Sequence, residues 1–125
     1  EKGDKNCVRA VLERMWGDVS WAVRLASVKA VERMAFPGDE QALLGLVGRV
    51  ADPEAARGST FLVREEALHT AMRMAGADTG IHMVMQRIQN ESWEERAAAL
   101  QVLLLAANKI PCRLDDRYHP AGPKS

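Results

Sequence analysis

The stretch Ser20-Trp21-Ala22-Val23-Arg24-Leu25-Ala26-Ser27-Val28-Lys29-Ala30-Val31-Glu32-Arg33-Met34-Ala35 decides the fold, because two later stretches repeat its pattern. The second begins Thr60-Phe61-Leu62-Val63-Arg64 and runs to Ala75, and the third begins Ser92-Trp93-Glu94-Glu95-Arg96 and runs to Ala107. In each stretch a hydroxyl residue suited to an N-cap is followed by an aromatic residue and then by an arginine. Apolar residues at three- and four-residue spacing predict an amphipathic helix for all three stretches.

A further amphipathic helix is predicted before each of these stretches, at residues 4–16, 39–50 and 78–88. Glycines at positions 45 and 48 allow close helix approach at some cost in helix propensity. Trp16 falls at an inward position of the first helix, and the fifth helix is expected to start at Asp78 or Thr79. The expected N-caps of the second, third, fourth and sixth helices are Ser20, Asp39, Thr60 and Ser92.

Six helices joined by short turns form either an up-and-down bundle or a stack of hairpins, and the internal repeat favours the stack. Trp21, Phe61 and Trp93 are equivalent positions that lie 40 and 32 residues apart, and their rings are expected in the core. The odd-numbered helices align in the same way, so a whole two-helix unit repeats, which is typical of a solenoid. The longer spacing reflects extra residues at 54–59, predicted as a surface loop.

This pattern resembles the HEAT-repeat family, whose units carry an acidic or amide residue in the turn and Val-Arg early in the second helix. Asp18 precedes Val23-Arg24 at that spacing, whereas Glu95 stands where valine is usual. The resemblance implies an all-α, right-handed α-solenoid of three HEAT-like helical hairpins over residues 1–108, with repeats at about 5–36, 39–75 and 78–108, and an extended, Pro-rich C-terminal tail at 109–125. It also implies a structural ladder along the turns, formed by Asp18, Arg24, Asp52, Arg64, Asn90 and Arg96, in which each arginine serves nearby acceptors. Arginines that bind an anionic ligand are the alternative role.

Composition limits the classes of function. The chain has 125 residues with 17 Lys and Arg against 17 Asp and Glu, so it fits one domain with no overall attraction to nucleic acid or anionic membranes. No transmembrane segment is predicted, because the longest apolar run is about half of the roughly 20 residues required. The widely separated Cys7 and Cys112 favour an intracellular or organellar compartment without a disulfide. The absence of an initiator Met before Glu1 suggests a processed protein or a fragment.

The titratable residues do not form a catalytic pattern. His69, His82 and His119 lie in three different segments, and Cys112 with His119 lacks the paired spacing of a zinc site. Enzymes with HEAT-like folds include iron-binding hydroxylases with His-Glu pairs, bilin lyases and DNA alkylation-repair glycosylases, and the chain has no His-Glu pair. We therefore expect no catalytic residue, no cofactor and no metal.

Two surfaces are candidate protein-binding sites. Lys29, Arg33, His69 and Arg73 lie on the outward side of second helices, which line the concave face in HEAT solenoids, and suit an acidic segment of a partner. The sixth helix is apolar on nearly all sides, so Leu104 and Leu105 need a cover, either the tail with Ile110, Leu114 and Tyr118 or another chain. The predicted function is a non-catalytic protein–protein interaction scaffold, a subunit or fragment of a larger assembly. The alternative is a HEAT-like nucleic-acid or ligand-binding enzyme of the glycosylase or bilin-lyase type.

Overall fold

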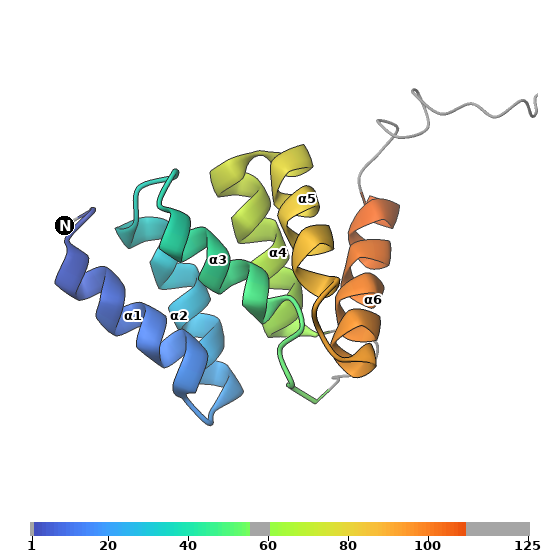
Figure 1. Cartoon of the computed structure of the whole chain (residues 1–125). Helices are drawn as coiled ribbons and strands as arrows, with labels where there is room; N and C mark the ends of the chain where they lie inside the picture. Colours follow the sequence, from blue (N-terminus) through green and yellow to red (C-terminus); the bar gives the residue numbers. More distant parts are fainter. Residues whose placement is uncertain (1, 56–60, 110–125) are drawn as a thin grey trace, which may run out of the picture.

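The computed structural model describes residues 2–55 and 61–109, which form six α-helices and no β-strand (Figure 1). This confirms the predicted all-α class. Thr60 and residues 110–125 of the predicted tail lie outside the described residues, and with them Cys112, His119 and the three apolar residues that are one of the two possible covers for the sixth helix. The helices are α1 (Lys5–Gly17), α2 (Trp21–Met34), α3 (Glu40–Arg49), α4 (Leu62–Ala75), α5 (Ala77–Ile88) and α6 (Trp93–Lys109).

Polar side chains start three helices where the sequence predicts them. Ser20 Oγ accepts a hydrogen bond from the backbone N–H three residues ahead at 3.5 Å, and Asp39 Oδ1 does so at 3.0 Å. At α6, the Glu95 N–H donates to Ser92 Oγ at 3.2 Å while the Ser92 N–H donates to Glu95 Oε1 at 3.3 Å, a reciprocal capping box. These bonds satisfy N–H groups that have no partner within the helix, so each start is encoded locally.

The predicted starts of α4 and α5 differ from the structure. Phe61 occupies the N-cap position of α4, and its side chain makes no capping hydrogen bond. Helix α5 begins at Ala77 rather than at Asp78 or Thr79, because Gly76 both ends α4 and precedes α5. Gly76 has φ +95°, a conformation that glycine adopts without steric cost, so a single residue makes the turn.

The helices pack as two parallel series. Helix α1 packs against α2 and α3 against α4, while α5 contacts both α4 and α6. Among the odd-numbered helices α1 contacts α3 and α3 contacts α5, and among the even-numbered helices α2 contacts α4 and α4 contacts α6. In Figure 1 the α1–α2 pair and α6 accordingly lie at opposite ends of the row of helices.

One continuous core lies between these helices, and all six contribute to it. Its largest fully buried apolar side chains are Met15, Leu46, Leu68, Val28, Val31, Val50, Val63, Val84 and Val102. The close helix approach predicted at Gly45 is present and brings α3 against α1, since a Cβ at Gly45 would lie 2.8 Å from Met15 Cε. Burial of each such Val, Leu or Met side chain contributes about 1.5–3 kcal/mol, so the core holds both series together.

The aromatic residues occupy the core less than the sequence suggests. Trp21 packs against the core as expected, but Trp93 is 68% exposed and Trp16 is 44% exposed, so both predictions of burial are wrong. Trp16 lies at the end of α1, where Arg49 covers its ring. Trp93 faces outward because, among the described helices, none lies beyond α6 to cover it.

Candidate functional site

Asp52 is the centre of a buried ionic cluster at the turn after α3. Its side chain is completely buried, and its carboxylate accepts two hydrogen bonds from Arg24 of α2, Nε to Oδ2 and Nη2 to Oδ1, both at 2.9 Å. Arg49 Nη1 donates to Oδ2 at 3.0 Å, and the Glu54 N–H donates to Oδ1 at 3.0 Å. A bidentate guanidinium with further donors satisfies the carboxylate in this buried site, so the turn after α3 is joined to α2.

The predicted ladder therefore joins the first two hairpins. Arg24 also donates to the backbone oxygen of Asp18 at 2.8 Å, and Arg64 Nε donates to that of Asp52 at 2.6 Å. Burial lowers the pKa of Arg64, although the charges of Glu54 and Asp52 oppose this effect. Arg24 and Arg64 thus each bind the backbone carbonyl of a turn. In the described contacts, the carboxylate that Arg24 binds is that of Asp52, which belongs to the next hairpin.

In the third hairpin the ladder has a different acceptor. Arg96 Nη1 donates to the backbone oxygen of Glu91 at 2.7 Å, so in the described structure the carbonyl of Glu91 takes the place expected for Asn90. Arg96 and Asn90 are both exposed. The last rung lies at the surface and is not joined to a neighbouring hairpin by any described contact.

Two members of the cluster are absent from the sequence prediction. Arg49 ends α3 and lies three residues before Asp52 in the turn that follows, and this short separation of opposite charges is the signal that could have revealed it. Glu54 is 5% exposed and accepts a hydrogen bond from the Arg64 N–H at 2.8 Å. The prediction of a surface loop is therefore wrong at Glu54, because the carboxylate caps the first turn of α4.

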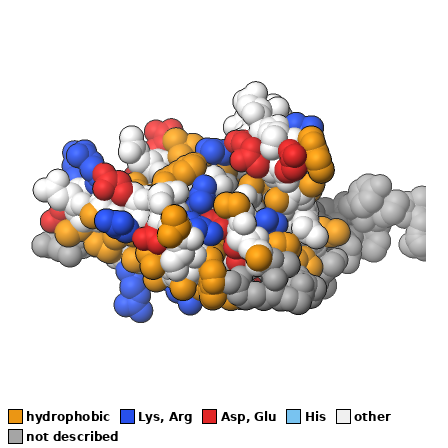
Figure 2. Space-filling view, turned by 90° about the horizontal axis from the view of Figure 1, so that it is seen from below, with side chains coloured by type: hydrophobic (Ala, Val, Ile, Leu, Met, Phe, Trp, Pro, Cys, Tyr) orange, Lys and Arg blue, Asp and Glu red, His pale blue; other side chains and the backbone are white. Residues whose placement is uncertain are grey.

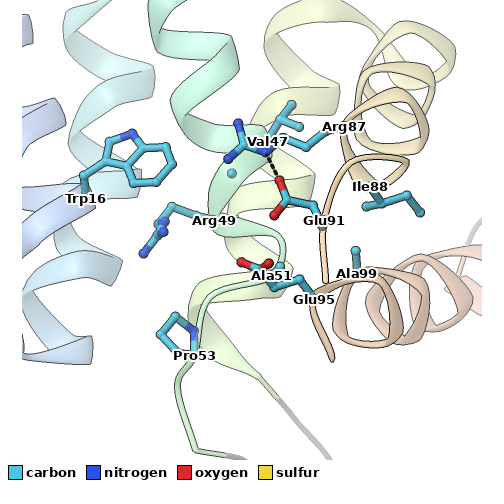
Figure 3. A pocket seen from close by; sticks show the side chains of 11 residues that line it. Trp16, Val47, Arg49, Ala51, Pro53, Arg87, Ile88, Glu91, Glu95 and Ala99 are labelled. Atoms are coloured by element: carbon cyan, nitrogen blue, oxygen red, sulfur yellow. Dashed lines mark hydrogen bonds and ion pairs between the residues drawn. The ribbon is translucent and has the colours of Figure 1, made fainter. Parts of the chain in front are cut away.

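A pocket of about 320 Å³ opens beside this cluster (Figure 3). Trp16 stands at one side and Ile88 and Ala99 at the other, with charged side chains between them. The Arg49 guanidinium carbon lies 4.5 Å from the centre of the Trp16 ring, and that of Arg87 lies 5.6 Å away. Both distances suit cation–π contact, so the tryptophan and the two arginines form one wall.

Three of the four charged side chains that line the pocket, Arg49, Arg87 and Glu91, take part in ion pairs. Arg87 Nε lies 3.0 Å from Glu91 Oε2, and Arg49 is held by Asp52. Burial lowers the pKa of Arg49, while hydrogen bonding with Glu91 and then with Ser92 lowers the pKa of Glu95. The Nε atom of Arg49 is buried away from solvent and has no hydrogen-bond partner in the described structure. Glu95, the other charged residue of the lining, is exposed and forms the capping box with Ser92.

The predicted basic stripe is divided between free and engaged side chains. Lys29 and Arg33 are exposed, and His69 is half-buried. Arg73, in contrast, donates to both carboxylate oxygens of Glu32 on α2, at 2.8 and 2.9 Å, and to Glu66 at 2.9 Å. These carboxylates raise the pKa of Arg73, and the hydrogen bond with Arg73 lowers the pKa of Glu32. Two solvated cations therefore remain, Lys29 and Arg33, and Arg73 joins α2 to α4.

Helix α6 carries an exposed apolar stripe that includes one of the two predicted leucines. Leu104 is 63% exposed, whereas Leu105 is half-buried. Ala97 and Leu100 are also exposed, and the spacing 93, 97, 100, 104 places them with Leu104 and Trp93 on one helix face. We call this face, Trp93, Ala97, Leu100 and Leu104, the α6 stripe. The buried residues of α6 lie on its opposite face and include Ala99, Val102 and Ala106.

Within the described part of the chain, neither surface charge nor metal-ligating side chains mark a further site. On the face shown in Figure 2, described acidic and basic side chains are interspersed among apolar ones. In residues 2–55 and 61–109 no group of three His, Cys, Asp or Glu side chains is placed to hold a metal ion. No helix in this same part of the chain is long and apolar enough to cross a bilayer. The chain matches no protein-family profile, no curated protein and no solved structure.

Proposed function

We propose that this chain is an α-solenoid of three HEAT-like hairpins and serves as a non-catalytic protein–protein interaction module within a larger assembly. The two series of helix contacts support the solenoid, since each even-numbered helix meets the next even-numbered helix. The bonds from Arg24 to Asp52 and from Arg73 to Glu32 support a stiff stack, because both connect successive hairpins.

The observation that carries this proposal is the α6 stripe. Trp93, Leu100 and Leu104 are 68%, 47% and 63% exposed, and they lie together on one helix face. Contiguous apolar surface of this kind is uncommon on isolated soluble domains and marks contacts with other molecules. Large aromatic and aliphatic side chains on a stiff support are also the residues that dominate binding energy at interfaces.

Affinity capture with mass spectrometry tests the proposal. The immobilised chain is expected to retain a stoichiometric protein partner, and Leu104→Asp is expected to release it. Val19→Asp is the matched control, because Val19 is 97% exposed in the turn between α1 and α2, outside the α6 stripe. Equal retention by wild type, Leu104→Asp and Val19→Asp would contradict the proposed interface.

The basic stripe is tested in the same assay. Charge reversal of the exposed Arg33 should weaken capture of a partner that presents an acidic segment, while the α6 variant should act on an apolar contact. The competing function is a nucleic-acid or ligand-binding enzyme. Salt-dependent binding to DNA, or a chromophore that absorbs in the purified chain, would favour that alternative.

A further inference from the structure

The α6 stripe occupies repeat positions that form an interface elsewhere in the molecule. Counting from Trp21 to Trp93, its four members correspond to Trp21, Leu25, Val28 and Glu32 of α2. This face of α2 is turned towards α4, because Glu32 bonds Arg73 of α4 and Val28 is fully buried. The α6 stripe is thus the α6 counterpart of the surface by which α2 contacts α4.

The opposite end of the row carries the complementary surface. An open groove of about 500 Å³ lies between α1 and α2, and we call it the first-hairpin groove. On α2 it is lined by Val23, Ser27 and three alanines, Ala22, Ala26 and Ala30, and on α1 by Ala10, Val11 and the longer Arg14. Small side chains leave room in this groove for larger side chains from another helix.

The groove residues of α2 correspond to the residues of α4 that face α2. The counterparts of Val23, Ala26 and Ala30 are Val63, Glu66 and Thr70, and that of Arg33 is Arg73. Arg73 reaches Glu32 of α2, and Val63 and Thr70 are fully buried. The first-hairpin groove is thus the counterpart of the surface by which α4 receives α2.

We propose that the α6 stripe of one molecule docks in the first-hairpin groove of a second copy, head to tail. The inference rests on the proposed function, since it names the occupant of the same α6 stripe. The proposal follows from the contact between α2 and α4. The α6 stripe corresponds to the face of α2 in that contact and carries large side chains, while the first-hairpin groove corresponds to the face of α4 and is lined mostly by smaller ones. Because the two faces differ, the contact is heterologous and adds copies in an open row.

Analytical ultracentrifugation of the full chain tests this arrangement. The average mass of wild type should rise with concentration beyond that of a dimer. Leu104→Lys blocks one end and Val23→Asp blocks the other, and each variant alone should remain monomeric. Val23 is 38% exposed, and an acid in the first turn suits a helix N-terminus, so Val23→Asp should fold, as circular dichroism verifies. Val19→Asp, in the exposed turn, is the control that should associate like wild type.

An equimolar mixture of the two blocked variants provides the decisive result. Each variant keeps one intact end, so the mixture should form a dimer with one of each and grow no further. The proposal would be overturned if wild type stayed monomeric at all concentrations or if the mixture stayed monomeric. A monomeric wild type is the outcome expected if residues 110–125 cover the α6 stripe within the same molecule. Association that survives Val23→Asp but not Leu104→Lys would also overturn it, because that pattern indicates a symmetric contact between two α6 helices.

Changes of charge at Leu104 and Arg33 test how the two copies are aligned. Leu104 is the counterpart of Glu32, and Arg33 is the counterpart of Arg73, so in the docked row Arg33 of one copy faces Leu104 of the next. Leu104→Glu should therefore weaken association less than Leu104→Lys, and Arg33→Glu combined with Leu104→Lys should restore it. Equal loss in all three variants would refute this alignment. Capture of a different partner by the α6 stripe would leave the proposed function intact even if self-association failed.

Discussion

Replacement of Asp52 by alanine tests the physical account of the stack most directly. The carboxylate is fully buried and accepts hydrogen bonds from Arg24, Arg49 and the Glu54 N–H. The side chains of Arg24 and Arg49 are 9% and 11% exposed, so in the variant two guanidinium groups would stay buried without a counter-ion. Loss of one partner from a buried ion pair costs about 3–5 kcal/mol. We expect the upper half of this range, because two cations lose the same carboxylate.

The assay is urea denaturation at pH 7, followed by circular dichroism. A domain of this size is stabilised by roughly 5–15 kcal/mol in total, so Asp52→Ala should lower the midpoint strongly or prevent folding. Asp52→Asn keeps the shape of the side chain but removes its charge, and should lose nearly as much. Arg24→Met should lose less, since Arg49 still neutralises Asp52.

Glu13→Ala is the matched control for Asp52→Ala, because Glu13 is an exposed acid on α1 and its loss should change stability by at most about 0.5 kcal/mol. A cost below about 1 kcal/mol for Asp52→Ala, with an unchanged denaturant slope, would refute the buried cluster as a main support of the stack.

Three further predictions concern single positions, each measured by the same denaturation assay. Glu32→Gln should cost about 0.5–1 kcal/mol of stability at pH 7. The hydrogen bond with Arg73 lowers the folded-state pKa of Glu32 below its ordinary 4.5. The difference from wild type should therefore be present above about pH 4.5 and vanish as the pH falls through the folded-state pKa. Gly76→Ala should cost about 1–3 kcal/mol, since φ +95° is strained for alanine, whereas Gly17→Ala, with open space around it, should be nearly neutral. Trp93→Ala should cost less than about 1 kcal/mol, far below the 3–5 kcal/mol of a core tryptophan, because its side chain is largely exposed.

Each of these predictions has an outcome that would contradict it. A Glu32→Gln difference that does not shrink as the pH is lowered below 4.5 would show that the loss is not electrostatic. Equal effects of the two glycine substitutions would remove the argument from backbone conformation. A large loss of stability in Trp93→Ala would mean that the ring is covered in solution. Binding of a second copy would give the same result, so the assay is run at low protein concentration.

The starts of several helices were predictable because they depend on neighbouring residues. Ser20, Asp39 and Ser92 accept hydrogen bonds from N–H groups three residues ahead, and such bonds form wherever the chain enters the helix. The start of α5 was missed by one residue, because the left-handed conformation of Gly76 allowed a shorter turn than the pattern suggested.

The candidate sites were predictable only in part. The placement of Arg24 and Asp52 at the turns follows from the repeated positions. The bond between Arg24 and Asp52 of the next hairpin, the burial of Glu54 and the approach of Arg49 to Trp16 depend on how the helices come together. Likewise, the repeat placed Arg73 beside Arg33 in a common stripe, while the packing of α4 on α2 gave Arg73 two carboxylate partners and left Arg33 exposed.

By itself the sequence determined the all-helical class, most of the helix starts and the equivalence of Trp21, Phe61 and Trp93, because spacing and capping act within a few residues. Only the tertiary structure decided that Trp21 packs on the core while Trp93 is exposed, and that Asp52 is buried between two arginines. The physical reason is that burial depends on what lies beyond each helix. Equivalent residues differ when one has a neighbour to cover it and the other, on α6, has none in the described chain.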